Sequence, residues 1–335
     1  MATILVTGGA GYIGSHACKA LARAGHTPVS YDNLSRGFAH AVKWGPFEQG
    51  DLHDGARLAE VIVRHRPAAV IHFAAFAYVG EAMADPAPYF HNNVSGSLSL
   101  LEAMRAEGVR NIVFSSSCTV YGARTSDPIT EDTPQVPVDP YGRSKFMVEL
   151  VLHEYVRAYG FAATALRYFN AAGADPDGEI GEDHDPEPHL IPVLLDAAAK
   201  SAAFTINGDD FATPDGTCVR DYVHVSDLAD AHVLALEALL RRGGGFAAYN
   251  LGTGRGFTIR EVIDAASKRV ERDIQVKVGP RRPGDLDAST AVSALAEREL
   301  GWTPKLSNLN DIIDTAWRWR LRRLNRAGLP VEPVS

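Results

Sequence analysis

The sequence contains few cysteines and no long hydrophobic run. Its three cysteines, Cys18, Cys118 and Cys218, are widely spaced, so they provide neither a disulfide framework nor a CxxC motif for zinc or redox chemistry. No apolar stretch reaches the length of a membrane span, and the N-terminus has neither the basic nor the apolar region of a signal peptide. We therefore expect a cytoplasmic protein with no membrane partner.

An excess of positive charge is also absent. The chain has 33 Lys and Arg against 41 Asp and Glu, a formal net charge of −8. Its longest basic patch is the short one from Arg320 to Arg323, so we expect no nucleic-acid partner. What is present is an ordinary globular composition: 335 residues that are 46% hydrophobic, enough to bury the core of one large or two modest domains.

The N-terminal segment has the pattern of a dinucleotide-binding turn. An apolar run over residues 3–7 leads into Gly8, Gly11 and Gly14, and residues 15–24 have helical periodicity. Such glycines permit a tight turn and close approach of the backbone to a pyrophosphate, which also meets the N–H groups of the helix start. A purely structural glycine turn is the alternative.

The next predicted strand, over residues 27–31, ends at Asp32. A carboxylate at this place can accept hydrogen bonds from a ribose 2′-hydroxyl and repels a 2′-phosphate, so we expect NAD rather than NADP. Arg36 is the residue that argues against this, since an arginine nearby can hold the 2′-phosphate.

Strands and helices continue to alternate up to residue 116. We predict strands over 47–51, 69–73 and 111–116 and helices over 56–65 and 92–107, which indicates an α/β fold with a doubly wound parallel (Rossmann) sheet. Ligands bind beyond the carboxyl ends of such strands. The residues predicted at those ends, as cofactor contacts, are Asp51, Leu52, Phe73, Ala74, Ala75 and Ser115, with Ser117 two residues further on.

Tyr141 and Lys145 lie four residues apart at the start of a predicted helix, so their side chains point the same way. An ammonium beside a phenol favours the phenolate, so we expect a lowered tyrosine pKa and a general base. Ser117 follows the strand predicted over 111–116, at the edge of the sheet where ligands bind. It can therefore meet Tyr141 and Lys145 over a nicotinamide. Taken alone, such a pair is common on solvated helices, and a serine cluster is common in turns.

Eight motifs together resemble those of the UDP-glucose (UDP-galactose) 4-epimerases, within the extended short-chain dehydrogenase/reductase superfamily. They are 7–16 (TGGAGYIGSH), 32–34 (DNL), 92–94 (NNV), 114–122 (FSSSCTVYG), 141–145 (YGRSK), 166–173 (LRYFNAAG), 219–224 (VRDYVH) and 281–285 (RRPGD), spread over nearly the whole chain. The resemblance implies an NAD-dependent isomerase of galactose metabolism that interconverts UDP-galactose and UDP-glucose through a transient 4-keto sugar. It also implies a homodimer.

The resemblance assigns roles to individual residues. Tyr141 is the expected catalytic base, Lys145 is expected to bond the nicotinamide ribose, and Ser117 the sugar 4-oxygen. The UDP part is expected to be held by Asn170, Arg220, Arg282 and Asp285. Further contacts are implied to the cofactor for Tyr12, Ile13, Asn33, Asn93 and Phe169, and to the substrate for His189, Leu190, Asn207, Tyr222 and Ser289.

Beyond Asn170 the alternation weakens. Residues 171–188 form a Gly-, Asp-, Glu- and Pro-rich loop, which we take as the link from an NAD-binding domain (1–170) to a smaller α/β UDP-sugar-binding domain (171–335). Segments near 220–250 are expected to return to the first domain, among them a helix over 227–240 capped by Ser226. The loop carries His184, Asp185, Glu187 and His189, but their spacing matches no standard ligand pattern, so we expect no metal.

Other functions are compatible with a Rossmann fold of this kind. The related sugar-nucleotide dehydratases carry an Asp-Glu pair, and the decarboxylases a Glu, where this chain has Cys118 and Thr119, so both are disfavoured. A non-catalytic NAD-sensing module would be expected to have lost Tyr141, Lys145 or Ser117, and all three are present. A UDP-xylose/UDP-arabinose 4-epimerase stays open, because residues 77–81 and 215–220 are also similar to that group.

The preferred sugar is not fixed by these motifs. Ala77, Asn207 and His189 depart from the best-known UDP-galactose epimerases. In that family a bulky tyrosine at the position of Ser289 is associated with exclusion of N-acetylhexosamines. The small serine leaves room there, so we expect UDP-GlcNAc and UDP-GalNAc to be substrates as well.

Overall fold

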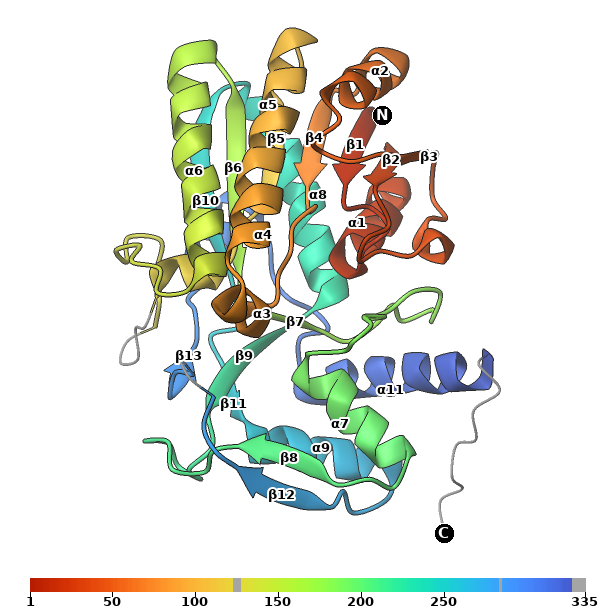
Figure 1. Cartoon of the computed structure of the whole chain (residues 1–335), viewed down its shortest axis with the longest axis vertical. Helices are drawn as coiled ribbons and strands as arrows, with labels where there is room; N and C mark the ends of the chain where they lie inside the picture. The colour runs from red at the N-terminus through yellow and green to blue at the C-terminus, as the bar shows by residue number, and fades with distance from the viewer. Residues whose placement is uncertain (123–127, 283–284, 327–335) are drawn as a thin grey trace.

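The computed structural model describes residues 1–122, 128–282 and 285–326 and has two lobes, one above the other in Figure 1. The upper lobe is built on a seven-stranded sheet of order β10-β6-β5-β4-β1-β2-β3, in which all neighbouring strands are parallel. The predicted doubly wound sheet is thus confirmed. Its strands are β1 (Thr3–Thr7), β2 (Thr27–Asp32), β3 (Phe47–Gln49), β4 (Ala69–His72), β5 (Asn111–Ser115), β6 (Ala162–Tyr168) and β10 (Gly245–Leu251).

Helices cover both faces of this sheet, because successive residues of a strand point to opposite faces and both faces are apolar. In β1, Ile4 and Val6 face one hydrophobic cluster and Leu5 faces the other. The first cluster is closed by α1 (Tyr12–Arg23) and α8 (Val225–Arg242). The second is closed by α2 (Gly55–His65), α5 (Gly96–Ala106) and α6 (Pro140–Tyr159).

The lower lobe has two small sheets and its own core (Figure 1). One sheet pairs β8 (Phe204–Asn207) with β12 (Val276–Gly279); the other joins β9 (Val219–His224) to β7 (Asn170–Ala172), β11 (Gly256–Thr258) and β13 (Ala288–Ser289). Buried side chains of α7 (Leu190–Ala199), α9 (Ile259–Val270) and α11 (Leu309–Arg326) form the core. The remaining helices are η1 (Ala39–Ala41), α3 (Val79–Ala84), α4 (Ala87–Tyr89), η2 (Phe90–Ser95), η3 (Cys118–Tyr121) and α10 (Ala294–Leu300).

Three local predictions were wrong in detail. Helix α1 begins at Tyr12, earlier than predicted, because Gly11 is already its N-cap. The helix predicted over 92–107 opens with the π-helical turn η2 before α5. Helix α8 is capped by His224, whose Nδ1 accepts the N–H of Ser226 at 3.0 Å, and the predicted cap Ser226 lies inside the helix.

Two further observations bear on the predictions. In the ranges that the structure describes, no helix is both long and apolar enough to cross a bilayer. Residues 283–284, inside the motif at 281–285, lie outside the described residues, as do residues 123–127 and 327–335.

Candidate functional site

The glycine turn between β1 and α1 fits a dinucleotide. Gly8 has φ +74°, and a Cβ there would stand 2.6 Å from the backbone N of Ala74. A Cβ on Gly14 would overlap the carbonyl oxygen of Gly8, so this cradle admits glycine only. At the N-cap, Gly11 has no side chain to bond the first N–H groups of α1, which therefore remain available to a phosphate.

Asp32 stands at the carboxyl end of β2, beside this turn. Its buried carboxylate accepts the N–H groups of Ala10 (3.1 Å) and Leu34 (2.8 Å), and burial raises its pKa against these bonds. The dissenting residue Arg36 is engaged elsewhere: its guanidinium donates twice to Glu81, at 2.7 and 2.8 Å. These contacts favour the predicted preference for NAD.

The other strand-end residues lie along the same edge of the sheet. Asp51, just beyond β3, accepts from Asn33 Nδ2 at 2.7 Å. Leu52 is buried against Gly96 of α5, and the ring of Phe73 lies 4.5 Å from that of His232. Ala74 and Ala75 follow Phe73 and are partly buried.

Asn93 is buried, and its carboxamide is hydrogen-bonded within the protein. Its carboxamide accepts from the N–H of Phe76 at 2.8 Å and donates to Phe76 O and to Ser144 Oγ, both at 3.0 Å. Asn93 therefore joins the segment after β4 to helix α6, which carries the tyrosine and the lysine.

The remaining predicted cofactor contacts are mostly packed into the protein. Tyr12 donates its hydroxyl to the carbonyl oxygen of Gly173 at 2.6 Å, and Ile13 packs against the core of the upper lobe. Phe169 is buried with Val120 and Tyr121.

The predicted catalytic residues converge at the carboxyl end of β5. Helix α6 starts at Pro140 after Asp139, whose side chain accepts the N–H of Gly142 at 2.8 Å, so Tyr141 and Lys145 lie in its first turns. The Lys145 Nζ is 5.8 Å from the ring centroid of Tyr141 and donates to the carbonyl oxygen of Ser115 at 2.8 Å. The hydroxyl of Ser117, two residues on, accepts from Thr119 Oγ1 at 3.0 Å.

The pKa of Tyr141 differs from the expectation. Burial raises it well above its usual value, with Tyr168 adding to the effect and a hydrogen bond with Ser117 opposing it. Burial disfavours the charged form of Lys145 as well, and lowers its pKa to about 7 although the nearby Glu149 carboxylate raises it. The expected lowering of the tyrosine pKa was therefore wrong for the protein alone: desolvation of a phenol in this pocket outweighs an ammonium that is directed at Ser115.

A buried ion pair beneath this site was missed from the sequence. Arg167 of β6 donates to Glu149 of α6 at 2.5 Å, both side chains being almost fully buried, and Ser116 also donates to Glu149. The pair fixes α6 against β5 and β6. The available signal was a charged residue in each of two otherwise buried faces.

The residues predicted to hold the UDP part lie on the lower lobe, around β9. Arg220 donates to Leu286 O at 2.8 Å and lies 3.4 Å from Asp285. Asn170 donates to Asp221 O at 2.9 Å. Ser289 of β13 is paired with Arg220.

One further pair and three other residues complete this set. With its amide turned to satisfy both groups, Asn207 accepts from Arg282 Nε and Nη2 at 3.0 and 2.9 Å. Tyr222 is buried in the core of the lower lobe, and Leu190 opens helix α7, for which His189 is the N-cap.

His189 belongs to a cluster that the sequence analysis saw only in part. Its Nδ1 lies 2.6 Å from Glu182 Oε1, and the Nδ1 of His184 lies 3.3 Å from the same oxygen. Burial opposes the charge of both imidazoles, but Glu182 and Glu187 outweigh it and raise the pKa of His184 to about 9 and that of His189 to about 10. Glu182, not Asp185, is the residue that joins the two histidines and Glu187.

Comparisons with known proteins agree over nearly the whole chain. The NAD dependent epimerase/dehydratase family matches residues 4–252. A UDP-glucose 4-epimerase of Rhizobium meliloti (strain 1021) is 50% identical over 97% of this chain and 98% of its own. The crystal structure of UDP-glucose 4-epimerase from Brucella ovis in complex with NAD is 51% identical, has a TM-score of 0.92 and covers 99% of this chain and 100% of its own. UDP-arabinose 4-epimerase 1 of Arabidopsis thaliana is 41% identical over 99% of this chain and 82% of its own.

Proposed function

Since the chain belongs to the NAD dependent epimerase/dehydratase family, we propose that it interconverts UDP-galactose and UDP-glucose by reversible epimerisation at C4. One observation carries this proposal: Ser117, Tyr141 and Lys145 meet at the carboxyl end of β5. The glycine turn follows β1, a strand of the same parallel sheet, so both lie at the same edge of that sheet. The similarity to curated UDP-glucose 4-epimerases supports the sugar nucleotide.

The chain's own residues divide the work as follows. Bound NAD supplies a reversible hydride acceptor for the sugar C4. Tyr141 takes the proton of the 4-hydroxyl and later returns it, and Ser117 bonds the 4-oxygen. Lys145 holds the nicotinamide ribose, and its positive charge favours the phenolate form of Tyr141, which is the form that can take the proton.

Epimerisation also requires that the 4-keto sugar rotate between removal of the C4 hydride and its return, so that the hydride returns to the opposite face. The protein must therefore hold the UDP part firmly and the sugar loosely. Arg220 and Arg282 supply paired donors suited to a pyrophosphate, in a chain whose net charge of −8 would otherwise repel it. Asp285 and Asn170 supply hydrogen-bonding groups beside them.

Elimination chemistry is poorly supported by the same pocket. Cys118 stands where the dehydratases that the sequence resembles carry an acid, and burial raises the pKa of its thiol to about 12. Thr119 next to it does not ionise. Neither residue offers an acid or base near neutral pH.

An assay of the purified protein with UDP-galactose tests the proposal. We expect UDP-glucose to form without added NAD, because the cofactor is regenerated in each turnover. Absence of turnover on UDP-galactose, UDP-GalNAc and UDP-xylose alike would instead indicate a non-catalytic NAD-binding protein.

The pentose reaction is the second candidate. It is favoured by the 41% identity to UDP-arabinose 4-epimerase 1 over 99% of this chain. Side-by-side measurement of kcat/KM on UDP-xylose and UDP-galactose decides between the two: a higher value on UDP-xylose would make the hexose reaction secondary.

The cofactor has its own test. Mass spectrometry of the nucleotide released on denaturation should recover mainly NAD, given the carboxylate of Asp32 and the engagement of Arg36 by Glu81. Recovery of mainly NADP would overturn this part of the proposal.

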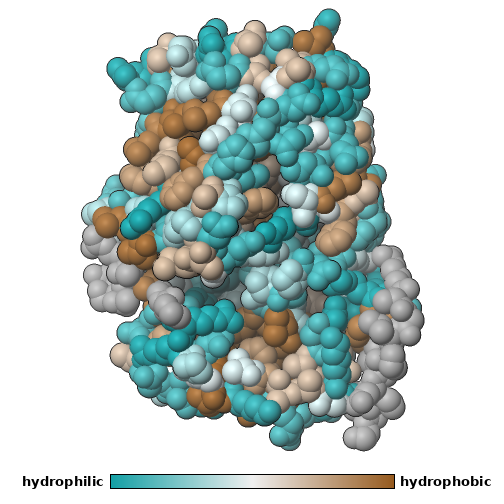
Figure 2. Space-filling model, in the orientation of Figure 1, coloured by the Kyte–Doolittle hydropathy of each residue, from teal (hydrophilic) through white to brown (hydrophobic). Residues whose placement is uncertain are grey.

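The proposal includes the setting in which the enzyme works. We place it in galactose metabolism in the cytoplasm, a compartment that suits its three free cysteines. We also propose that it has an NAD-binding domain (1–170), to which segments near 220–250 return, and a UDP-sugar-binding domain (171–335), and that it pairs as a homodimer. The pairing of β10 with β6 supports that return. The dimer is supported by three exposed apolar side chains on helices α5 and α6: Leu98, Met147 and Leu150. Figure 2 shows hydrophobic surface at the upper left of this face.

A further inference from the structure

Four side chains from the segment between β7 and α7 converge on one point. Glu182, His184, Glu187 and His189 each present one ligand atom, and these four atoms all lie within 4.8 Å of one another. The distance from Glu182 Oε1 is 3.3 Å to His184 Nδ1 and 2.6 Å to His189 Nδ1. From Glu187 Oε1 to the same two nitrogens it is 3.6 and 3.3 Å.

These atoms are close without being hydrogen-bonded in the ordinary way. Among the described residues, Glu182 Oε1, His184 Nδ1, Glu187 Oε2 and His189 Nδ1 are buried and have no aligned hydrogen-bond partner. Glu187 uses Oε1 to accept the N–H of His189 at 3.0 Å, which leaves Oε2 free. The residue Glu182 is only 7% exposed. Without an ion these four groups satisfy one another only as carboxylate–imidazole ion pairs, so their convergence without aligned hydrogen bonds indicates that one partner common to all four can replace the two imidazole protons.

We propose that this cluster binds a divalent transition-metal ion, zinc above others. Two imidazole nitrogens and two carboxylates form a donor set that suits zinc, whereas magnesium and calcium prefer oxygen ligands alone. Four ligands at about 2.1 Å from a tetrahedral ion are about 3.4 Å apart. The separation from Glu182 Oε1 to His184 Nδ1, and the two from Glu187 Oε1, which also accepts the N–H of His189, lie within 0.2 Å of that value. The two carboxylates also neutralise a dication.

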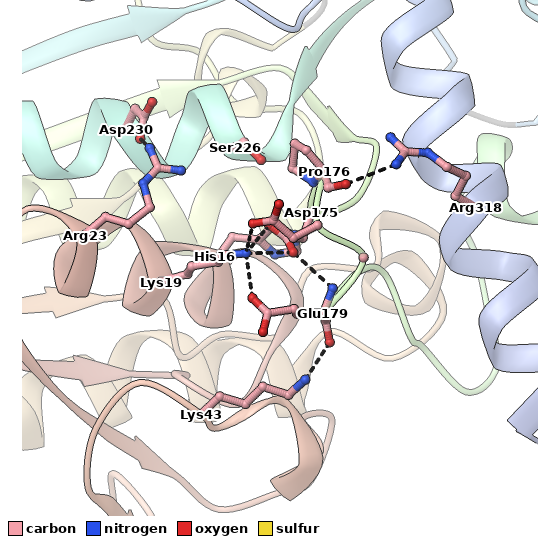
Figure 3. Close-up of polar contacts among 12 residues, drawn as sticks. His16, Lys19, Arg23, Lys43, Asp175, Pro176, Glu179, Ser226, Asp230 and Arg318 are labelled. Atoms are coloured by element: carbon pink, nitrogen blue, oxygen red, sulfur yellow. Dashed lines mark hydrogen bonds and ion pairs between the residues drawn. The ribbon is translucent and has the colours of Figure 1, made fainter.

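A neighbouring acidic cluster shows what a site already filled by a cation looks like. Asp175, Asp177 and Glu179 lie close enough to hold an ion, but the Lys19 ammonium reaches each of them at 2.7 to 2.8 Å. Figure 3 shows Lys19 extending from α1 into this loop, between Asp175 and Glu179. Among the described residues, the ion pairs of the histidine cluster include no lysine: its counter-charges are the two imidazoles, which release their protons when a metal ion binds, whereas the Lys19 ammonium stays charged.

The ion would fix the conformation of the segment between β7 and α7, which contacts both lobes. The His184 ring is nearly perpendicular to the rings of Tyr12 and Tyr78, with centroids 6.3 and 5.6 Å apart, and both tyrosines belong to the upper lobe. On the other side, Trp319 of α11 donates to Glu182 O at 2.9 Å, and His189 is the N-cap of α7. Its role is positioning, because none of the four ligands belongs to the catalytic group around Tyr141.

The test uses full-length protein without a polyhistidine tag, treated with a chelator and dialysed. Zinc is titrated by calorimetry into wild type and into Glu182→Gln and His184→Asn, which keep the shape of each side chain and weaken its ligand atom. The matched control is Asp177→Asn, in the cluster that Lys19 already neutralises. We expect one zinc per chain in wild type and control, binding weaker by about tenfold or more in the two ligand variants, and a rise in Tm with zinc that only those variants lose.

Two results would overturn the proposal. One is wild-type protein that takes up no zinc, and the other is zinc uptake that is unchanged in both ligand variants. If a ligand variant fails to fold, wild type decides alone: cobalt bound in the site gives the intense visible absorption of a tetrahedral ion, and magnesium at the same concentration does not displace it. Cobalt without that absorption would likewise refute a four-ligand site. The readouts are independent of turnover, so they stand whether or not the proposed epimerase activity is found.

Discussion

Tyr141 is shielded from solvent, as expected of a group that exchanges a proton with the substrate and not with water. Its ring is buried among aromatic side chains and its hydroxyl is next to Ser117. Replacement by Phe keeps the ring and removes the proton acceptor, so we expect turnover to fall by about 10² or more while NAD stays bound. A coupled assay and the absorbance of released NAD measure both.

The matched control is Tyr159→Phe, the same change on an exposed residue at the far end of α6. It should leave turnover unchanged. Near-normal activity of Tyr141→Phe would show that another group moves the proton.

Lys145 exchanges stability for function. Burial lowers its pKa to about 7 in the folded protein, whereas the value in an unfolded chain is about 10.4. The unfolded state therefore binds more protons between these pH values, so the burial of Lys145 costs most below pH 7 and its cost fades as pH rises through this window. We expect Lys145→Met to raise the free energy of unfolding at pH 6, by an amount that shrinks toward pH 10, and to lose turnover.

Urea unfolding of cofactor-free protein at several pH values measures this effect. The exposed Lys200→Met serves as the control and should show no such trend. A gain in stability that is equal at pH 6 and pH 10 would contradict the proton-linked explanation.

Ser289 is expected to set which sugars fit. It lies in β13 opposite Arg220, partly buried, and a phenol in its place cannot be compressed in a packed pocket. Ser289→Tyr should abolish interconversion of UDP-GalNAc and UDP-GlcNAc and retain that of UDP-galactose, whereas Ser289→Ala should retain both. Wild type that turns over UDP-galactose but not saturating UDP-GalNAc would refute the assignment.

Sequence reasoning found those residues whose role follows from chain position. Gly8, Asp32 and Ser117 follow strands, and Lys145 is one turn from Tyr141. It failed where the neighbour comes from elsewhere in the chain. Lys145 contacts the Ser115 carbonyl, and Tyr141 is desolvated, because of the way α6 packs against β5. The spacing of residues in the sequence does not predict this packing.

At the scale of elements, the first turn of α6 is held by a single cap. Asp139 accepts the N–H of Gly142 and so fixes the turn that carries Tyr141. Asp139→Ala should cost about 1 kcal/mol of stability, the usual value of an N-cap, and should also lower kcat with little change in KM. Denaturant unfolding and steady-state kinetics measure the two effects.

The N-cap of α9 provides a control that distinguishes a loss of overall stability from a loss of positioning of Tyr141. Thr258 caps α9 through a capping box, far from the catalytic group. Thr258→Ala should lose similar stability and keep kcat. Equal loss of kcat in the two variants would mean that Asp139 acts only through overall stability.

Element types were predictable where the pattern was long, and less so at turns. The strands β1, β4 and β5 follow from their buried apolar runs. The π-helical turn η2 was not predictable, because Asn93 satisfies backbone groups after β4 that are distant in sequence. The cluster around Glu182 was missed for a similar reason: a folded loop, not a regular spacing, brings its ligand atoms together.

At the scale of the whole molecule, the proposed dimer depends on the apolar face of α5 and α6. Leu150→Glu places a charge in that face and should convert the protein to a monomer. Light scattering coupled to gel filtration gives the mass directly. Val63→Glu on α2 is the control, an equally exposed apolar residue away from this face, and it should leave the mass unchanged. A monomeric wild type would refute the proposal.

The position of β10 has a consequence for the birth of the chain on the ribosome. This strand pairs with β6 and forms the final edge of the sheet, and β7, α7, β8, β9 and α8 are synthesised between the two. A nascent chain that has released β6 but not β10 thus displays the edge of β6, whose residues are all buried in the folded protein, whereas the final edge strand β10 is partly exposed. Such edges recruit other chains, so emerging polypeptides need shielding by chaperones until β10 arrives, and a product that stops after residue 170 should precipitate rather than persist as a free cofactor-binding fragment.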